Sequence, residues 1–249
     1  MQLAEESVNY NLNQEKKKYV HNKLVKNILQ DKKEATEFIN QFLEPREEIK
    51  EELIRYTNSY ITKKYKSKEA DLVYKLKNQE VFFLIEHQST IDNNMSYRML
   101  NYCLDIMQEW SKNRKIRKST SYPIIVPIVI YTGNKKWKFQ KDLQEKQIGT
   151  YVLERYKIDI EYNLIDINKL SNQYLLEKNT MFGYIMFLEK AQNKDELIKN
   201  LDIVIKSIKD KEKLKEIVNI ISYLSDNVLE EQIQKELLEK MKHELALAS

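Results

Sequence analysis

Residues 69–88, EADLVYKLKNQEVFFLIEHQ, are the stretch that decides the fold. Residues 70–77 and 80–87 form two runs rich in β-branched and aromatic side chains. Only Asn78 and Gln79 separate the runs, and so short a connection is typical of a β-hairpin. The stretch therefore predicts two antiparallel strands joined by a tight turn.

The length of this turn also predicts which residues of the hairpin face each other. A turn centred on the two intervening residues pairs Val73 with Leu84 and, at the open end, Asp71 with Glu86. Directly opposed residues of antiparallel strands have Cβ atoms about 4.5–5.5 Å apart. Side chains repeat every second residue, so Gln88 is expected on the same face as Glu86. Two carboxylates and an amide are thus predicted to lie together.

Opposed carboxylates repel each other unless a positive group lies between them. A divalent cation with oxygen ligands would supply that charge. Alternatively, both acids lie at a solvent-exposed strand end, and lysine side chains supply the positive charge. The candidate lysines are Lys68, Lys75 and Lys77. The residues alone leave a metal site and lysine-paired acids as alternatives.

The composition favours a helical protein with a small sheet. Of 249 residues, 42% are hydrophobic, which is enough for a sizeable core. Three glycines and three prolines are too few for a turn-rich all-β fold. Glycine-rich phosphate loops of the Walker or dinucleotide-binding type do not occur in the sequence, which argues against an ATPase, a kinase or a dehydrogenase.

The chain carries a formal net charge of +4, and its basic residues gather locally. Three basic clusters flank the predicted sheet, and two of them contain an aromatic residue. They include Lys64, Lys66 and Lys136 and span residues 63–68, 112–118 and 135–138. Such clusters can follow a phosphate backbone, and they are also typical of the surface of a lysine-rich protein.

Cys103 is the one cysteine of the sequence, which excludes an intramolecular disulfide and a thiolate zinc site. Its place in an amphipathic helical pattern favours a small buried side chain over a catalytic thiol. The longest apolar run, residues 124–131, is too short to span a bilayer, and no N-terminal segment resembles a signal peptide. We expect a soluble cytoplasmic protein with no membrane contact.

Hydrophobic spacing predicts the elements around the hairpin. Three helices are expected before it: residues 16–30, a segment with Phe38, Ile39, Phe42 and Leu43 that ends before Pro45, and a segment from about Arg46 with Ile49, Leu53 and Tyr56 on one face. A strand is expected at residues 60–65. After the hairpin, Ser89, Thr90 and Asp92 offer N-caps for a long helix that reaches about Lys112.

The second half of the chain changes character near residue 170. Strands are expected at residues 122–131 and 156–167, and Pro127 implies that the former lies at an edge or contains a bulge. Helices are expected at residues 179–191, 194–209, 212–224 and 227–243. The last of them carries Val228, Ile233, Leu237 and Leu238 on an amphipathic pattern, through which the chain would form a homo-oligomer.

Four blocks of the sequence resemble a known family: ADLVY at 70–74, FLIEHQS at 83–89, YRMLNY at 97–102 and VPIVIYTGNKKW at 126–137. From about Tyr19 to Asp166 the chain resembles the recombination-promoting nuclease and transposase-like (YhgA-like) family of the PD-(D/E)XK nuclease superfamily. The resemblance implies an α/β (α+β) fold with a restriction-endonuclease-like αβββαβ core, in which helices flank a mixed central sheet. Residues 1–170 would form this nuclease-like domain, with a core at about 19–167, and residues 171–249 an all-helical C-terminal region.

The resemblance also implies roles for the residues at the open end of the hairpin. Asp71 and Glu86 match the metal-binding acids of the superfamily, and the main-chain carbonyl of His87 would be a further ligand of Mg²⁺, or of Mn²⁺ in its place. Gln88 stands where the superfamily usually has lysine. An amide can orient a water and donate to a phosphate oxygen, but it carries no charge. With Asp71, Glu86 and Gln88 as the catalytic group, more of the catalytic load would fall on the metal.

Two further positions bear on the expected site. The family commonly has His-Asp near the start of its first helix, where this chain has His21-Asn22. If these two residues are accessory to metal binding, Asn22 offers an oxygen ligand without the charge. Arg98, in the helix after the hairpin, would either contact DNA or pair with an acid such as Asp92 or Asp105.

The function implied by the resemblance is a metal-dependent DNA endonuclease that hydrolyses phosphodiester bonds, promotes recombination or is linked to mobile elements. Its nucleic-acid contacts would come from Arg98, Tyr97, Lys64, Lys66 and Lys136. The alternative is a non-catalytic nucleic-acid-binding or assembly module on a decayed nuclease fold, which Asn22 and Gln88 favour.

Overall fold

The computed structural model describes residues 24–56, 71–113, 121–137, 142–149, 155–191, 193–208, 213–217 and 239. The chain divides into two compact units. One unit comprises Leu29–Lys169, and the other joins the residues before Leu29 to those from Leu170 onward. The assignment of residues 1–170 and 171–249 to separate domains stays a prediction.

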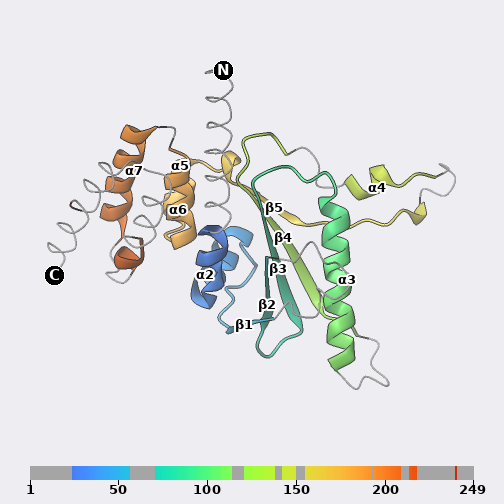
Figure 1. Ribbon diagram of the computed structural model, residues 1–249. Helices are drawn as coiled ribbons and strands as arrows, with labels where there is room; N and C mark the ends of the chain where they lie inside the picture. Colours follow the sequence, from blue (N-terminus) through green and yellow to red (C-terminus); the bar gives the residue numbers. More distant parts are fainter. Residues whose placement is uncertain are drawn as a thin grey trace, which may run out of the picture. The chain divides into compact units, whose positions relative to one another are not determined.

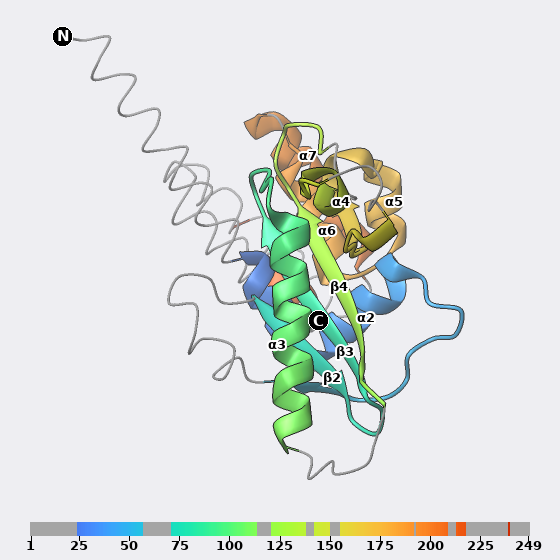
Figure 2. The same cartoon turned by 90° about the vertical axis from the view of Figure 1, so that its right-hand side faces the viewer.

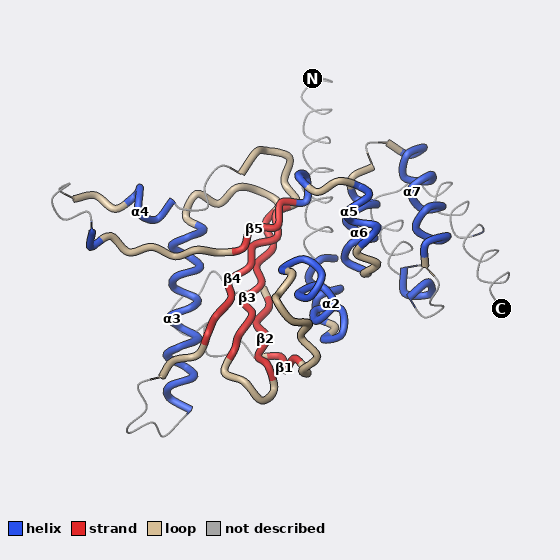
Figure 3. The backbone as a smooth tube through the Cα atoms, turned by 180° about the vertical axis from the view of Figure 1, so that it is seen from behind, coloured by secondary structure: helices blue, strands red, loops and turns tan. Residues whose placement is uncertain are grey.

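A five-stranded mixed sheet forms the centre of the Leu29–Lys169 unit (Figure 1). Its strands lie side by side in the order β1-β2-β3-β4-β5, which Figure 3 shows in red. They are β1 Leu53–Arg55, β2 Leu72–Leu76, β3 Val81–Gln88, β4 Ile124–Tyr131 and β5 Asn163–Asp166. Strands β1 to β3 are antiparallel, whereas β4 runs parallel to β3 and β5 parallel to β4. The expected mixed sheet is confirmed.

The hairpin has the predicted register. Val73 pairs with Leu84, and Lys75 pairs with Phe82. The last pair of the ladder towards the open end is Leu72 with Ile85, so Asp71 follows directly beside Glu86. Residues 77–80 form the connection between the strands. The turn length alone was therefore sufficient to place the two acids.

Helix α3, Met95–Asn113, covers one face of the sheet (Figure 2). As predicted, its apolar positions repeat at three and four residues and pack on strand residues of the same face. The buried side chains between helix and sheet include Val73, Phe82, Leu84, Met95, Met99, Tyr102, Ile106, Trp110, Val129 and Tyr131. Because side chains alternate along a strand, Glu86 and Gln88 belong to this face as well.

Helix α2, Lys32–Leu43, lies on the opposite face of the sheet (Figure 1). The Asp31 side chain caps it by accepting from the main-chain N–H groups of Lys33 and Glu34 at 2.8 and 3.0 Å. The helix ends at Leu43 and is followed by Glu44, whose φ of 47° is left-handed, so it stops before Pro45 as predicted. On this face the buried Tyr74 hydroxyl donates to the carbonyl of Leu29 at 2.5 Å.

The predicted third helix was wrong, because residues 53–55 form strand β1 instead. Leu53 pairs with Leu76, and the main-chain N–H of Tyr56 donates to the Val73 carbonyl at 2.8 Å. The segment before β1 is anchored to α2 by Asn40, whose side chain exchanges two hydrogen bonds with the main chain of Ile49, of 2.8 and 3.0 Å. Pairing with β2 thus overrides the helical spacing of the apolar residues.

The expectation for Pro127 was also wrong: β4 is an inner strand, and its ladder with β3 runs without a bulge. The main-chain N–H groups of Ile124 and Thr132 donate to carbonyls of β3 and its preceding turn. Because N–H groups alternate along a strand, those of the odd-numbered residues of β4 point towards β5. Pairing with β5 starts only at Ile128. The missing N–H of Pro127 therefore falls beside the end of the β5 ladder, where no strand bond is required.

The remaining predictions for the chain before Leu170 are confirmed only in part. Strand β5 is shorter than the predicted strand at 156–167. The predicted strand at residues 60–65 lies outside the described residues, as does the predicted helix at 16–30 up to residue 23. Residues 24–30 of that helix are helical. A short helix α4, Asp142–Lys146, and a 3₁₀ turn, Ile167–Lys169, complete the unit.

The other unit is helical where it is described beyond Leu170. It contains α5 Asn172–Glu177, α6 Met181–Glu189 and α7 Lys194–Ser207, which are capped by Ser171, Thr180 and Asn193. Residues 181–188 of α6 are all buried, which identifies it as the central helix of this group. Among the described residues, none of the helices combines the length and the apolar character that crossing a membrane requires. The predicted oligomerisation segment around Val228 lies outside the described residues.

Candidate functional site

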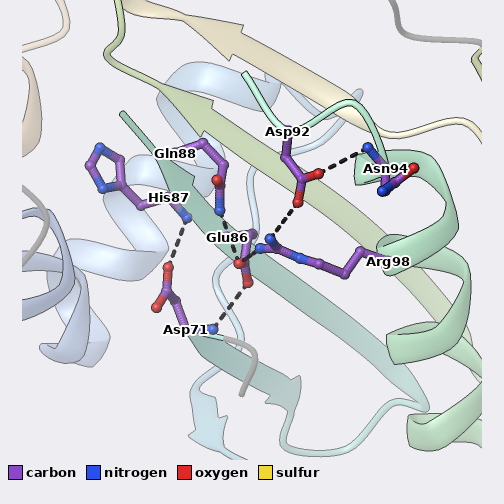
Figure 4. A network of polar contacts seen from close by, with 7 residues as sticks. All are labelled: Asp71, Glu86, His87, Gln88, Asp92, Asn94 and Arg98. Carbon is purple, nitrogen blue, oxygen red and sulfur yellow. Dashed lines mark hydrogen bonds and ion pairs between the residues drawn. The ribbon is translucent and has the colours of Figure 1, made fainter. Parts of the chain in front are cut away.

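Asp71 and Glu86 meet at the open end of the β2–β3 hairpin (Figure 4). The main-chain N–H of Asp71 donates to Oε2 of Glu86 at 3.3 Å, and the main-chain N–H of His87 donates to Oδ2 of Asp71 at 2.9 Å. Each acid is therefore held by the main chain of the opposite segment. Glu86 is buried, with 4% of its surface exposed, and Asp71 is half-buried.

Gln88 and His87 point to opposite sides of β3, as predicted. The Gln88 amide donates to Oε1 of Glu86 at 3.1 Å, which places it with the acids. The ring of His87 is buried on the other face, where Nε2 lies 2.9 Å from the hydroxyl of Thr132. The His87 side chain is thus a packed group, and only its main chain faces the acids.

Arg98 supplies the positive charge beside the acids. From the first turns of α3 its guanidinium forms an ion pair with Oε1 of Glu86, and its Nη1 lies 2.7 Å from Oδ2 of Asp92. Asp92 in turn accepts from the main-chain N–H of Asn94 at 2.9 Å, just before the helix begins. The guanidinium thus bridges strand β3 and the start of α3.

The ion pair between Arg98 and Glu86 is largely shielded from solvent. Only 14% of the Arg98 side chain and 5% of the Glu86 side chain are exposed. Burial lowers the pKa of the Arg98 guanidinium from its ordinary value, and the neighbouring Tyr102 and the charge of Asp71 oppose this shift. Arginine remains charged in proteins all the same. A buried carboxylate needs such a partner, because an unpaired buried charge is strongly destabilising.

Two of the three candidate lysines pair elsewhere. Lys75 pairs with Glu80 at 3.3 Å, and Lys77 pairs with Glu52 at 2.9 Å. Lys68 lies outside the described residues. Of the two interpretations of Arg98, pairing with an acid is present: the guanidinium pairs with Asp92, as one interpretation had it, and also with Glu86.

The oxygen ligands at the open end fit a small divalent cation in their chemistry. Carboxylates and carbonyls are the groups that Mg²⁺ prefers, and it is commonly held by one or two carboxylates with several waters. The N–H of His87 points to Asp71, and in an extended strand the carbonyl of the same residue points to that side too. Among the described residues, no group of three or more His, Cys, Asp or Glu side chains is arranged to hold a metal. Such a site would therefore consist of Asp71, Glu86, the carbonyl and water.

The comparisons with known proteins agree with the resemblance of the sequence blocks. Residues 19–219 match the family described as "Putative transposase, YhgA-like". The chain belongs to this family. The match continues past Asp166 and covers the whole of α7, so the family pattern includes the helices described after Leu170.

A curated relative of the YhgA-like chain carries a more specific name. It is the "Recombination-promoting nuclease RpnD" of Escherichia coli O157:H7, which is 27% identical over 81 residues. The matched part spans 31% of this chain and 30% of the relative, so the chain aligns with less than a third of that protein. No solved structure matches the YhgA-like chain.

The other predicted site residues are only partly described. His21, Asn22, Lys64 and Lys66 lie outside the described residues. Tyr97 is 55% exposed at the start of α3, beside Arg98, and Lys136 is exposed in the loop after β4. Trp137, the aromatic residue of the same basic cluster, is buried and donates to the Tyr162 hydroxyl at 3.1 Å. It belongs to the core and offers no stacking surface to a nucleic acid.

Sequence reasoning missed the pairing of Arg98 with Glu86 and the part that Thr132 plays around the YhgA-like site. Asp92 was expected as an N-cap of α3 and as one possible partner of Arg98, and its side chain makes both contacts. The pairing with Glu86 had no signal in the sequence, because it depends on how α3 packs on the sheet. The contact of Thr132 with His87 depends on the parallel pairing of β3 with β4, which the sequence does not reveal. Cys103 is buried, as predicted.

Proposed function

We propose that this chain is a metal-dependent DNA endonuclease that hydrolyses phosphodiester bonds. The observation that carries the proposal is the meeting of Asp71 and Glu86 at the open end of the hairpin, each held by the main chain of the opposite segment. The order of helix, three antiparallel strands, helix and parallel strand is consistent with a restriction-endonuclease-like core of the PD-(D/E)XK type. The name of the curated relative supports nuclease activity.

Asp71, Glu86 and the main-chain carbonyl of His87 are the groups that would hold Mg²⁺, or Mn²⁺ in its place. Bound there, the cation supplies a nucleophilic water at neutral pH and neutralises charge on the scissile phosphate. Gln88 already donates to Glu86 through its amide, and it would orient the water and donate to a phosphate oxygen. Unlike the lysine usual at this position, Gln88 cannot itself neutralise developing charge.

DNA would approach the end of the sheet at which these residues lie. Exposed Tyr97 and Lys136, together with Lys64, Lys66 and Arg98, would provide contacts that are largely independent of base sequence. A role in recombination or in the movement of mobile elements would agree with the names of the relative and of the family. We place such an activity in the cytoplasm.

A second function has an observation of its own in its favour. Arg98 already pairs with Glu86, so the buried carboxylate is neutralised by the protein itself. Together with the neutral Gln88, this favours a non-catalytic nucleic-acid-binding or assembly module on a nuclease fold. Oligomerisation through the C-terminal helices would suit such a module.

A cleavage assay separates the two functions. Purified protein is incubated with supercoiled plasmid and with single-stranded DNA in Mg²⁺, Mn²⁺ or Ca²⁺. An endonuclease cleaves in Mg²⁺ or Mn²⁺, and Asp71→Ala and Glu86→Ala each abolish cleavage while circular dichroism shows an intact fold. Glu52→Gln, which removes an exposed acid directly before β1, is the matched control and cleaves normally. Equal nicking by wild type and both alanine variants would remove Asp71 and Glu86 from the mechanism.

A further inference from the structure

The bridge made by Arg98 has a consequence for the way a cation reaches Glu86. The guanidinium pairs with Glu86 and with Asp92, and the acids come from β3 and from the loop before α3. We propose that Arg98 is an exchangeable counter-charge: it pairs with Glu86 in the metal-free protein and transfers to a DNA phosphate when a divalent cation takes over Glu86. This inference rests on the proposed nuclease function.

The charges around the guanidinium explain why something must occupy its place. The Arg98 guanidinium pairs with two acids, Glu86 and Asp92, and the charge of Asp71 acts on it as well. Glu86 is the most buried of them, and opposed to Asp71 it would be unfavourable as a carboxylate without a positive partner. Arg98 supplies that partner as long as no cation is bound.

Arg98 also opposes the arrival of a cation. A divalent cation held by Glu86 would lie close to a guanidinium that is ion-paired with the same carboxylate. Like charges at such short range repel strongly in a partly buried site. Cation binding is therefore expected to weaken the pairing of Arg98 with Glu86.

Once released, Arg98 has the properties of a phosphate ligand. Its guanidinium fork matches phosphate oxygens as well as carboxylates. The Nε–H of Arg98 is buried and donates to no described residue, so its hydrogen bonding is incomplete in the paired state. The ion pair with Asp92 would hold the guanidinium near the start of α3 after its release from Glu86. The neighbouring Tyr97 is exposed at the same place. Arg98 would thus link cation binding to DNA binding.

Two equilibrium measurements test the exchange without any turnover. Ca²⁺ is titrated into the metal-free full chain by calorimetry, and binding of a short DNA duplex is then measured with and without saturating Ca²⁺. Wild type is compared with Arg98→Met, and Arg155→Met is the matched control, because Arg155 is an exposed arginine that stacks on Tyr156. Arg98→Lys keeps the charge but loses the fork, and it remains informative if the methionine variant does not fold.

Arg98→Met is expected to bind Ca²⁺ about tenfold more tightly than wild type, because a repelling charge has been removed. Arg98→Lys is expected to lie between the two. The gain in DNA affinity that Ca²⁺ produces in wild type is expected to shrink about tenfold in Arg98→Met, because the two ligands are coupled through Arg98. Arg155→Met should leave both quantities unchanged.

The possible failures are distinguishable. Weaker or unchanged Ca²⁺ binding in Arg98→Met and Arg98→Lys would overturn the exchange and assign Arg98 to holding Glu86 in position. An unchanged coupling of Ca²⁺ with DNA would equally overturn it. If wild type and Glu86→Gln bind Ca²⁺ alike, Glu86 is no cation ligand, and the proposed function fails together with the exchange.

Discussion

Oε2 of Glu86 accepts a 3.3 Å hydrogen bond from the main-chain N–H of Asp71, which makes the position of one acid depend on the backbone of the other. The reverse dependence runs through His87, whose N–H donates to Asp71 at 2.9 Å. A shift of the hairpin register by one residue would put the two acids on opposite faces of the sheet. The geometry of the candidate site is therefore secured by strand pairing.

Gln88→Ala is expected to slow Mg²⁺-dependent cleavage by about tenfold to a hundredfold without abolishing it, since a neutral donor is lost from the transition state. The Gln88 amide lies 3.1 Å from Oε1 of Glu86, within the group of acids. Single-turnover rates on plasmid DNA measure the effect. Gln79→Ala, which removes an amide at the hairpin turn, is the control. A rate equal to wild type in Gln88→Ala would exclude Gln88 from the reaction.

Gly133→Ala is expected to destabilise the protein by about 1–3 kcal/mol, as overpacking of a filled site does. A Cβ at Gly133 would lie 2.4 Å from the Ser89 carbonyl oxygen and 2.5 Å from the Tyr131 ring. Urea unfolding measures the change in the free energy of unfolding. At Gly149 a Cβ would meet nothing within 4 Å, so Gly149→Ala is the matched control and should be close to neutral. Equal stability of the two variants would contradict the close approach of Ser89.

Cys103 is expected to resist thiol reagents in the folded protein. Burial raises the pKa of its thiol to about 12, so the reactive thiolate is scarce at neutral pH. The sequence has a single cysteine, so a colorimetric disulfide reagent reports on this residue alone. Reaction should be slow in buffer and fast in denaturant. Rapid reaction of the native protein would show that the α3 face is open to solvent.

The same shift predicts a pH dependence of stability. Above the ordinary thiol pKa of about 8.5 the unfolded chain loses the Cys103 proton, whereas the folded chain keeps it up to about pH 12. The folded state then binds more protons, so the stability contribution of Cys103 falls as pH rises through this window. Urea unfolding at about pH 7 and about pH 10.5 should show a steeper loss in wild type than in Cys103→Ala. Parallel losses would contradict the raised pKa.

The logarithm of the DNA association constant is expected to fall linearly with the logarithm of the salt concentration, as counterions return to the phosphates. Lys136 is exposed in the loop after β4. If it contacts a phosphate, Lys136→Met should reduce the magnitude of the salt slope by about one. Fluorescence anisotropy with a labelled duplex measures the slope. Lys77→Met is the control because Lys77 pairs with Glu52 at 2.9 Å, and an unchanged slope for Lys136→Met would place Lys136 outside the interface.

The sequence predicted the hairpin well because two local constraints agree there. The short connection between the strands fixes the register, and the alternation of side chains fixes the faces. Val73 paired with Leu84 as predicted, and the opposite orientations of His87 and Gln88 followed from the same rule. The faces of α2 and α3 were predictable for a similar reason, since their apolar spacing leaves only one side to bury.

Features that depend on distant pairing were not predictable. Leu53 has helical spacing with its apolar neighbours, yet it lies in β1 because β2 offers a strand partner. Pro127 is tolerated in an inner strand because the β5 ladder starts only at Ile128, so no strand hydrogen bond needs the N–H that proline lacks. The pairing of Arg98 with Glu86 depends on how α3 lies on the sheet. From the sequence alone, several acids were equally suitable partners for Arg98.

All the residues of the candidate site that Figure 4 shows come from the continuous segment 71–98, because the hairpin leads directly into α3. The chain segments that separate Asp71, Glu86 and Arg98 are short. Because the entropy lost on closing a loop grows with its length, bringing these residues together costs little entropy. Contacts between residues close in sequence also tend to form early in folding. The acids and their arginine should therefore come together in one early local step, before β4 and β5 complete the sheet.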